Sequence, residues 1–364
     1  MIVSISYFWV VKLFQRERST VPNTQNAMRK ANEKNHLHTT TDWETICFPV
    51  RSVPVEQVIK NPYQMIPSDR QRMIIGSLPR TADKPGQEAI FAVQSAGYSL
   101  VPNATLRDAV TRVLGPEQPV HIRYNRLGEY AINILLPDET TIGPNDIIQR
   151  QLTFTNSYTG KSQFTIQGKE MKQVRQQKIR IAFHRQICLN GMMGWADEFY
   201  SLDEYLNWLL TGKQSDQVRV KGLEWVTEEE ETLSNFQHLF THRDIDLDDF
   251  QAFLAAFLRD FTSYARRCES PTLNVFQSLQ NCSIINREEA AQVVRKAGIP
   301  KTLVTAALER MEHEERLLDS LPNAWLLYNG VNHALFNGDT GLSMSARYQH
   351  DERAFHAISS RYLL

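Results

Sequence analysis

The residues best placed to carry chemistry are basic, and they gather in one part of the chain. Eight lysines and arginines lie between Ile147 and Asn190, and only Glu170 opposes them. Lysine and arginine side chains hold phosphate groups through charge and N–H donors. This segment therefore indicates contact with a nucleic-acid backbone. The residues that we expect to make the contact are Arg150, Tyr158, Lys161, Lys169, Lys172, Lys178, Arg180 and His184.

The period of the expected strands predicts which way these side chains point. Apolar residues are odd-numbered between Lys178 and Leu189. Lys178, Arg180 and His184 should therefore share the opposite face and meet solvent or a partner. Only Tyr158, in a turn, is free to stack on a base, so we expect backbone contact rather than base stacking. The alternative is that this basic face packs on acidic helices or is a solvated surface.

A second possibility is a magnesium-dependent nuclease. Pro137-Asp138 closes an expected strand, and Glu170-Met171-Lys172 follows later. In such enzymes two carboxylates hold Mg²⁺ and a lysine steadies the attacking water or the developing charge. The catalytic residues of this alternative are Asp138, Glu170 and Lys172.

Other candidate metal motifs lack residues that the corresponding site requires. His238 and His242 are four residues apart, but the glutamate of a His-Glu-x-x-His site is missing between them. Asp244, Asp246 and Asp248 resemble the start of a calcium loop, without its glycine or closing glutamate. We read these aspartates as helix caps. The preferred function therefore includes no metal and no cofactor.

The elements that would position the basic residues are strands followed by helices. Alternation of period two runs from 119 to 190 and predicts two hairpins and a further strand. Helical patterns predict a helix that Asn103 caps, another over Asp246–Arg267 and a final one over Ala324–Phe336. Capping pairs are expected at Ser201 with Glu204, Thr227 with Glu230 and Asn286 with Glu289. We predict an α+β fold with an antiparallel sheet: a loose N-terminal arm over 1–45, an α+β domain over 46–195 and a mainly helical domain over 196–364.

Composition narrows the class of protein without naming a reaction. The 364 residues carry 40 basic and 41 acidic side chains, yet ten of the carboxylates lie between Gly222 and Asp260. A third possibility is thus a protein-binding module whose acidic half imitates nucleic acid and occupies a host protein. The four cysteines form no C-x-x-C pair, which indicates reduced thiols in the cytoplasm. Residues 1–14 are apolar but too short to span a bilayer, so we expect no membrane contact.

Four patches resemble a known family. Tyr98-Ser99-Leu100-Val101-Pro102-Asn103, Phe154–Lys161, Arg180–Asn190 and Ala324–Gly330 are similar, in this order, to stretches of the phage/plasmid-like protein family, which is found on prophages and conjugative plasmids. Tyr158-Thr159 stands where that family tends to have His-Asp, which argues against metal or acid–base chemistry in this turn. The resemblance implies a setting on mobile DNA in a bacterial cytoplasm and carries over no activity.

These observations favour a non-enzymatic protein of a phage or plasmid. It would bind a nucleic-acid backbone through a basic sheet face and act in DNA maintenance, recombination or counter-defence.

Overall fold

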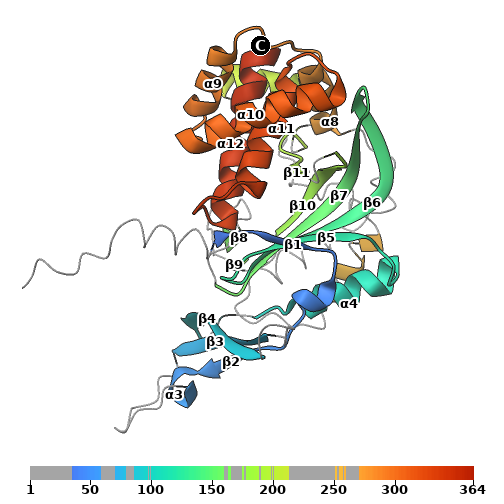
Figure 1. Ribbon diagram of the computed structural model, residues 1–364. Helices are drawn as coiled ribbons and strands as arrows, with labels where there is room; N and C mark the ends of the chain where they lie inside the picture. Colours follow the sequence, from blue (N-terminus) through green and yellow to red (C-terminus); the bar gives the residue numbers. More distant parts are fainter. Residues whose placement is uncertain are drawn as a thin grey trace, which may run out of the picture.

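The protein has an α+β fold, with antiparallel strands in the middle of the chain and helices in its C-terminal part (Figure 1). This confirms the predicted fold class. The structure is a computed structural model. It describes residues 35–58, 70–78, 86–96, 98, 100–159, 163–164, 174–175, 178–187, 190–197, 199, 201–212, 251, 254–256, 258–259 and 270–364.

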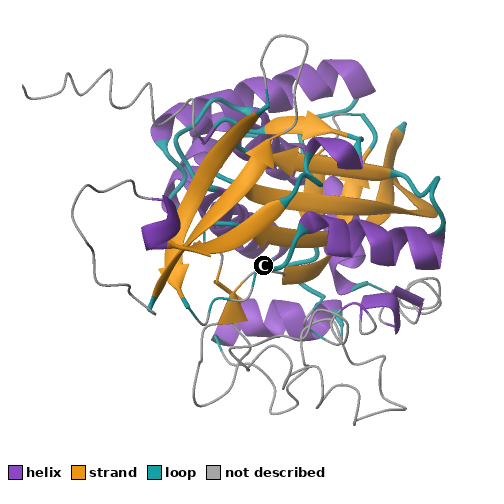
Figure 2. Cartoon of the chain, turned by 90° about the horizontal axis from the view of Figure 1, so that it is seen from below, coloured by secondary structure: helices purple, strands orange, loops and turns teal. Residues whose placement is uncertain are grey.

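A six-stranded antiparallel sheet forms the centre of the molecule. Its strands follow the order β1-β5-β6-β7-β10-β11, and Figure 2 shows them between helices on either side. The bounds are β1 His38–Thr40, β5 Val120–Tyr124, β6 Glu129–Gly143, β7 Asp146–Ser157, β10 Lys178–Arg185 and β11 Asn190–Met193.

The first predicted hairpin, which joins residues 120–124 to 130–134, is confirmed. The second, in which residues 164–166 would return along 152–154, is wrong. Strands β5 and β6 pair with Ile122 opposite Ile132, across a turn in which Gly128 adopts a φ of 80°. A positive φ of this kind favours glycine. Strand β7, however, pairs with β6 on one side and β10 on the other, so neither of its edges remains for residues 164–166. Instead β8 (Gln163–Phe164) pairs with β9 (Val174–Arg175) in a separate two-stranded ladder.

A smaller sheet and one helix cover part of the central sheet. Strands β2 (Val50–Pro54), β3 (Gln71–Leu78) and β4 (Gln87–Ser95) form this three-stranded sheet, which is followed by α4 (Asn103–Leu114). The α4 helix is confirmed, but its N-cap is Pro102 and no side chain caps it. The Asn103 side chain lies inside the first turn and donates to the carbonyl oxygen of Ile46 at 3.1 Å.

The helices of the C-terminal part begin at side-chain caps that the sequence shows. Ser201 accepts a hydrogen bond from the amide of Glu204, and Asn286 accepts from the amides of Glu288 and Glu289. Both confirm predicted capping pairs; the third, at Thr227, lies outside the described residues. In the described residues of this part, the helices are α5 Leu202–Thr211, α8 Pro271–Gln280, α9 Arg287–Lys296, α10 Lys301–Leu318, α11 Ala324–Asn337 and α12 Met344–Leu363.

The predicted end of the fold was wrong in one respect. Helix α11 is not the last helix, because α12 follows it, and α11 is buried on nearly every side rather than amphipathic. A Cβ on Gly330 would lie 2.2 Å from the carbonyl oxygen of Ala307, so glycine allows α10 and α11 to approach closely. Most of the predicted helix over 246–267 lies outside the described residues, although Leu254 and Leu258 are fully buried.

The predicted domain boundaries do not coincide with breaks in the packing. Strand β1 and the 3-10 helix η1 (Trp43–Thr45) lie within the predicted loose arm, and β1 is part of the central sheet. One hydrophobic cluster contains Phe183 and Met192 from the sheet together with Phe276 and Tyr328 from the helices, so the sheet and the helices share a core. In the part of the chain that is described, no helix has the length and apolar character needed to cross a membrane.

Candidate functional site

The register of the central sheet separates two faces of different chemistry. On one face, Ile134 lies opposite Leu152 and Ile132 opposite Phe154, and all four side chains belong to an apolar core. On the other face, Asn133 lies opposite Thr153 and Gln151 opposite Ala182. Directly opposed residues of an antiparallel pair point to the same side. The second face, which we call the polar face, is therefore a distinct layer.

The register also shows that the predicted basic residues do not share one face. Arg150 lies opposite Phe183, whereas Arg180 lies opposite Thr153 and Lys178 opposite Thr155. Positions 180 and 183 differ by an odd number, so Arg150 is on the opposite side of the sheet from positions 178 and 180. The prediction of one continuous basic face that includes Arg150 is wrong.

Two further predicted contact residues are buried. The Tyr158 side chain has no exposed surface, and its hydroxyl accepts a hydrogen bond from the amide of Asn103 at 3.0 Å. Burial also raises the pKa of this hydroxyl. His184 is 5% exposed and belongs to the polar face. Neither side chain is at the surface, because helices cover one face of the central sheet and the small sheet with α4 covers the other. The strand period assigns a residue to a face but cannot show that the face is covered.

The remaining predicted contacts belong to the chain between β7 and β10. Lys161, Lys169 and Lys172 lie outside the described residues, and β10 places the backbone of Lys178 and Arg180 but not their side chains. We call residues 160–180 the basic connection. It carries six lysines and arginines against Glu170, which gives a net charge of +5 (6 − 1). The β8–β9 ladder, with Arg175 opposite Gln163, lies within it.

The nuclease residues are not brought together by any described contact. Asp138 is exposed and lies inside β6, where the pairing with β7 shifts between Leu135 and Glu139. The prediction that Pro137-Asp138 closes a strand is therefore wrong, since β6 continues to Gly143. Glu170 and Lys172 lie outside the described residues. Within the described ranges no three His, Cys, Asp or Glu side chains are grouped to hold a metal ion.

The polar face is the most unusual feature of the described structure. Its polar side chains come from four neighbouring strands, and each is at most 8% exposed. Helix α11 covers this face: the Asn332 amide donates to the carbonyl oxygen of Gly191 at 3.2 Å, and the Phe336 ring lies 5.7 Å from the Arg123 guanidinium carbon. The residues of the polar face are His121, Arg123, Asn133, Gln151, Thr153 and His184.

Part of the polar face is hydrogen-bonded within itself. Thr153 donates to the Asn133 amide oxygen at 2.7 Å, and Gln151 donates to the same oxygen at 3.2 Å. Within the described part of the chain, however, the buried Nδ1 atoms of His121 and His184 and the Oε1 atom of Gln151 have no hydrogen-bond partner. A buried polar atom without a partner costs about 1–3 kcal/mol. Among the described residues, these atoms lack the partner that would offset this cost.

The two histidines lie together although three strand spacings separate their strands. Their ring centroids are 5.6 Å apart, whereas three spacings amount to about 14 Å in a flat sheet. The sheet therefore curls, and the polar face is its concave side. Burial, followed by the charge of Arg123, lowers the pKa of His121 to about 3 and that of His184 to about 4. Both imidazoles are therefore neutral near pH 7.

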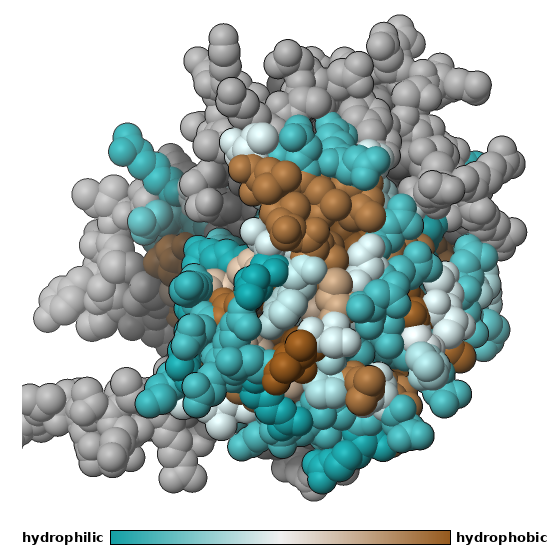
Figure 3. All heavy atoms as spheres, turned by 90° about the horizontal axis from the view of Figure 1, so that it is seen from above, coloured by the Kyte–Doolittle hydropathy of each residue, from teal (hydrophilic) through white to brown (hydrophobic). Residues whose placement is uncertain are grey.

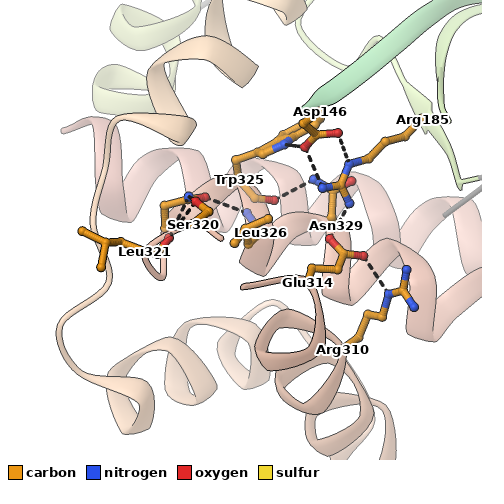
Figure 4. A network of polar contacts seen from close by, with 10 residues as sticks. Asp146, Arg185, Arg310, Glu314, Ser320, Leu321, Trp325, Leu326 and Asn329 are labelled. Carbon is orange, nitrogen blue, oxygen red and sulfur yellow. Dashed lines mark hydrogen bonds and ion pairs between the residues drawn. The ribbon is translucent and has the colours of Figure 1, made fainter. Parts of the chain in front are cut away.

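A second buried polar region is fully paired. Arg185 donates from Nε and Nη2 to both oxygens of Asp146, at 2.7 and 2.6 Å, and forms an ion pair with Glu314 (Figure 4). Trp325 donates to Asp146 at 2.7 Å, and Arg310 donates to Glu314 at 2.7 Å. Arg185, Asp146 and Glu314 are at most 2% exposed. We call this set the charged network; it ties β7 and β10 to α10 and α11.

A buried carboxylate lies beside the polar face. Trp195 and Tyr328 donate to Oδ2 of Asp351, and Asn332 donates to its Oδ1 at 2.8 Å. Burial raises the pKa of Asp351 to about 6, against the lowering effect of these three hydrogen bonds. Asn332 thus connects Asp351 with Gly191 on the polar face, while its own Oδ1 atom is buried without a described partner.

The helical end of the molecule exposes several apolar side chains. Ile285 is 98% exposed and Leu321 is 77% exposed, and the adjoining residues are joined by a hydrogen bond from the amide of Ile284 to the carbonyl of Pro322. Figure 3 shows this end with hydrophobic patches among hydrophilic surroundings. Such patches are typical of contact surfaces. The ten carboxylates between Gly222 and Asp260, on which the predicted acidic half depends, lie outside the described residues.

Comparison with known proteins returned no match: no family model, no curated protein and no solved structure is significantly similar to the chain. The resemblance to the phage/plasmid-like protein family therefore stays a prediction.

The sequence contained a signal for the polar face that the strand period concealed. His121, Arg123 and Asn133 alternate with apolar residues, a pattern that by itself is typical of a half-buried strand with one solvent-facing side. Asn329, Asn332 and His333, however, interrupt the otherwise apolar run of α11. Polar side chains in a fully buried helix need polar partners. That pairing of a polar strand face with a polar stripe on a buried helix indicates a covered face.

Proposed function

We propose that the protein binds the phosphate backbone of nucleic acid through the basic connection, residues 160–180, without catalysing a reaction. The observation that carries this proposal is the net charge of +5 on that connection, together with its own β8–β9 ladder, which is separate from the central sheet. A charged two-stranded extension is a known way for a protein to follow a nucleic-acid backbone.

The buried residues help to define the kind of contact. Tyr158 is covered, so stacking of a base on this ring is not part of the proposal. Arg150 and His184 are also removed from the contact set. The remaining residues, Lys161, Lys169, Lys172, Arg175, Lys178 and Arg180, supply charge and N–H donors without reading bases. Binding should therefore depend on salt and only weakly on sequence. The setting on mobile DNA, in maintenance, recombination or counter-defence, rests on the family resemblance.

A salt titration of binding to a single-stranded oligonucleotide tests this proposal. If about four phosphates are contacted, the logarithm of the affinity should fall against the logarithm of the salt concentration with a slope near three. The double variant Lys169→Glu/Lys172→Glu should weaken binding at least about tenfold and reduce the slope by about 1.4, since two contacts are lost.

The matched control is Lys296→Glu/Lys301→Glu, which reverses two exposed lysines at the end of α9 and the start of α10. This control should bind like the wild type. A flat salt dependence, or an equal loss in both variants, contradicts the proposal.

A further inference from the structure

Three aromatic rings and an arginine lie together at one edge of the central sheet. Strand β1 forms this edge, beside β5 (Figure 1). The ring centroids of His36 and His38 are 5.1 Å apart, and those of His38 and Tyr124 are 5.4 Å apart. Burial lowers the pKa of His38, and the nearby charges of His36 and Arg126 lower it further. We call His36, His38, Tyr124 and Arg126 the aromatic edge.

The aromatic edge is accessible from solvent. His36 and Arg126 are exposed, whereas His38 and Tyr124 are half-buried. Tyr124 packs against the apolar core, which holds its ring in place while part of the ring surface stays open. Among the described residues, no carboxylate contributes to the shifted pKa of His38 or of Tyr124. The surface at this edge is therefore aromatic and basic.

The strand register places the aromatic edge at the end of the sheet where the basic connection begins. One row of directly opposed residues crosses the sheet in the order His38, Tyr124, Tyr130 and Asn156. This row covers three strand spacings, about 14 Å in a flat sheet. The turn that carries Arg126 also contacts the chain two residues before the connection, since the amide of Tyr158 donates to the carbonyl oxygen of Gly128 at 2.9 Å. The two surfaces are therefore neighbours.

We propose that the aromatic edge stacks the unpaired bases of a single-stranded nucleic acid whose phosphates the basic connection holds. This inference rests on the proposed function and adds contact with bases, which the basic connection does not supply. Every base has a π-face, so stacking on these rings tolerates any sequence. Paired bases within a duplex stack on one another, so the aromatic edge favours single strands. Arg126 adds a guanidinium that can lie over a base or hold a phosphate.

Fluorescence anisotropy of the full chain at pH 8 tests the proposal with labelled oligonucleotides of equal length. A single-stranded DNA is compared with an abasic strand that has the same number of phosphates. The single strand should bind at least about fivefold tighter, because the abasic strand has nothing to stack. Equal affinity for the two strands overturns the proposal. DNA and RNA share the chemistry of base stacking, and an RNA strand of the same sequence shows which of them binds tighter.

Variants at one position separate stacking from other roles of the side chain. His38→Ala removes a ring and should weaken single-strand binding at least about fivefold, with unchanged affinity for the abasic strand and for a duplex. His38→Phe keeps a ring and should bind like the wild type. If His38→Ala does not fold, His36→Ala, at an exposed position outside β1, provides the same comparison. The control is His313→Ala, which removes an exposed histidine from α10.

Two results with these variants would overturn the stacking role. One is unchanged single-strand affinity in the folded alanine variants. The other is an equal loss of affinity in His38→Phe and His38→Ala, because it would show that the ring itself is not what binds.

The salt dependence distinguishes failure of this inference from failure of the proposed function. Stacking on neutral rings releases no counterions, so the alanine variants should keep a slope near three. A slope near three with equal affinity for the single strand and the abasic strand supports the basic connection and rejects the aromatic edge. A flat salt dependence rejects the basic connection, and with it the inference that depends on it.

Discussion

The charged network and the polar face are both buried against helix α11, yet they differ in how completely they are satisfied. In the charged network, the carboxylates of Asp146 and Glu314 receive hydrogen bonds on every oxygen. On the polar face, two imidazoles and one amide have buried atoms without a described partner. A complete network stabilises the fold, since removal of Arg185 takes away the cation that Asp146 and Glu314 share. An incomplete one leaves buried polar atoms whose loss of hydration is not offset.

The largest effect should follow from breaking the charged network. Arg185→Met leaves Asp146 and Glu314 buried without their shared partner and should reduce the free energy of unfolding by about 3–5 kcal/mol. Urea denaturation at pH 7 measures the loss. Arg287→Met is the control, because its ion pairs with Glu312 and Glu315 are partly exposed, and it should cost at most about 1 kcal/mol. Equal losses of unfolding free energy in the two variants would contradict the claim that the charged network contributes more to stability than exposed ion pairs do.

A smaller effect, dependent on pH, should come from the polar face. The folded pKa of His184, about 4, lies below its ordinary value of 6.5 because of burial and the charge of Arg123. The folded state thus favours the neutral ring. Its stabilising contribution is complete above pH 6.5 and is lost as the pH falls toward 4. The interval between 6.5 and 4 corresponds to about 3 kcal/mol.

Unfolding of the wild type and of His184→Gln, followed by urea denaturation between pH 4.5 and 7.5, measures this contribution. Glutamine does not titrate, so the free energy of unfolding of the variant should fall less steeply as the pH decreases. His313→Gln, in an exposed position on α10, is the control and should follow the wild type. Identical pH dependence in the wild type and His184→Gln would show that His184 is not held neutral by the fold.

The smallest effect on stability should follow from removing an unpartnered group. His121→Phe replaces a ring whose buried Nδ1 has no described partner, so the free energy of unfolding at pH 7 should change by less than about 1 kcal/mol. Thermal unfolding measures this change. A loss of unfolding free energy comparable to that of Arg185→Met would show that the polar face contributes as much to stability as the charged network. It would contradict the difference between the two regions.

Much of the architecture could be predicted from the sequence because it depends on residues that are close together in the chain. The alternation of Ile132 and Ile134 with polar residues predicted strands, and the side chains of Ser201 and Asn286 predicted helix starts. These features need only neighbours within a few residues. The pairing of β7 with β10 and of β8 with β9 could not be predicted, since the strand period allows these segments to pair in any of several registers.

The sequence by itself determined that basic side chains accumulate on one connection, that strands precede helices, and where several helices begin. Only the tertiary structure decided which polar positions face solvent. The period of a strand assigns residues to two sides of a sheet but cannot say what covers each side. Here α11 covers the side that carries His121 and His184, and the small sheet with α4 covers the side near Tyr158. Burial is a property of elements distant in the chain, and so it emerges only when they pack.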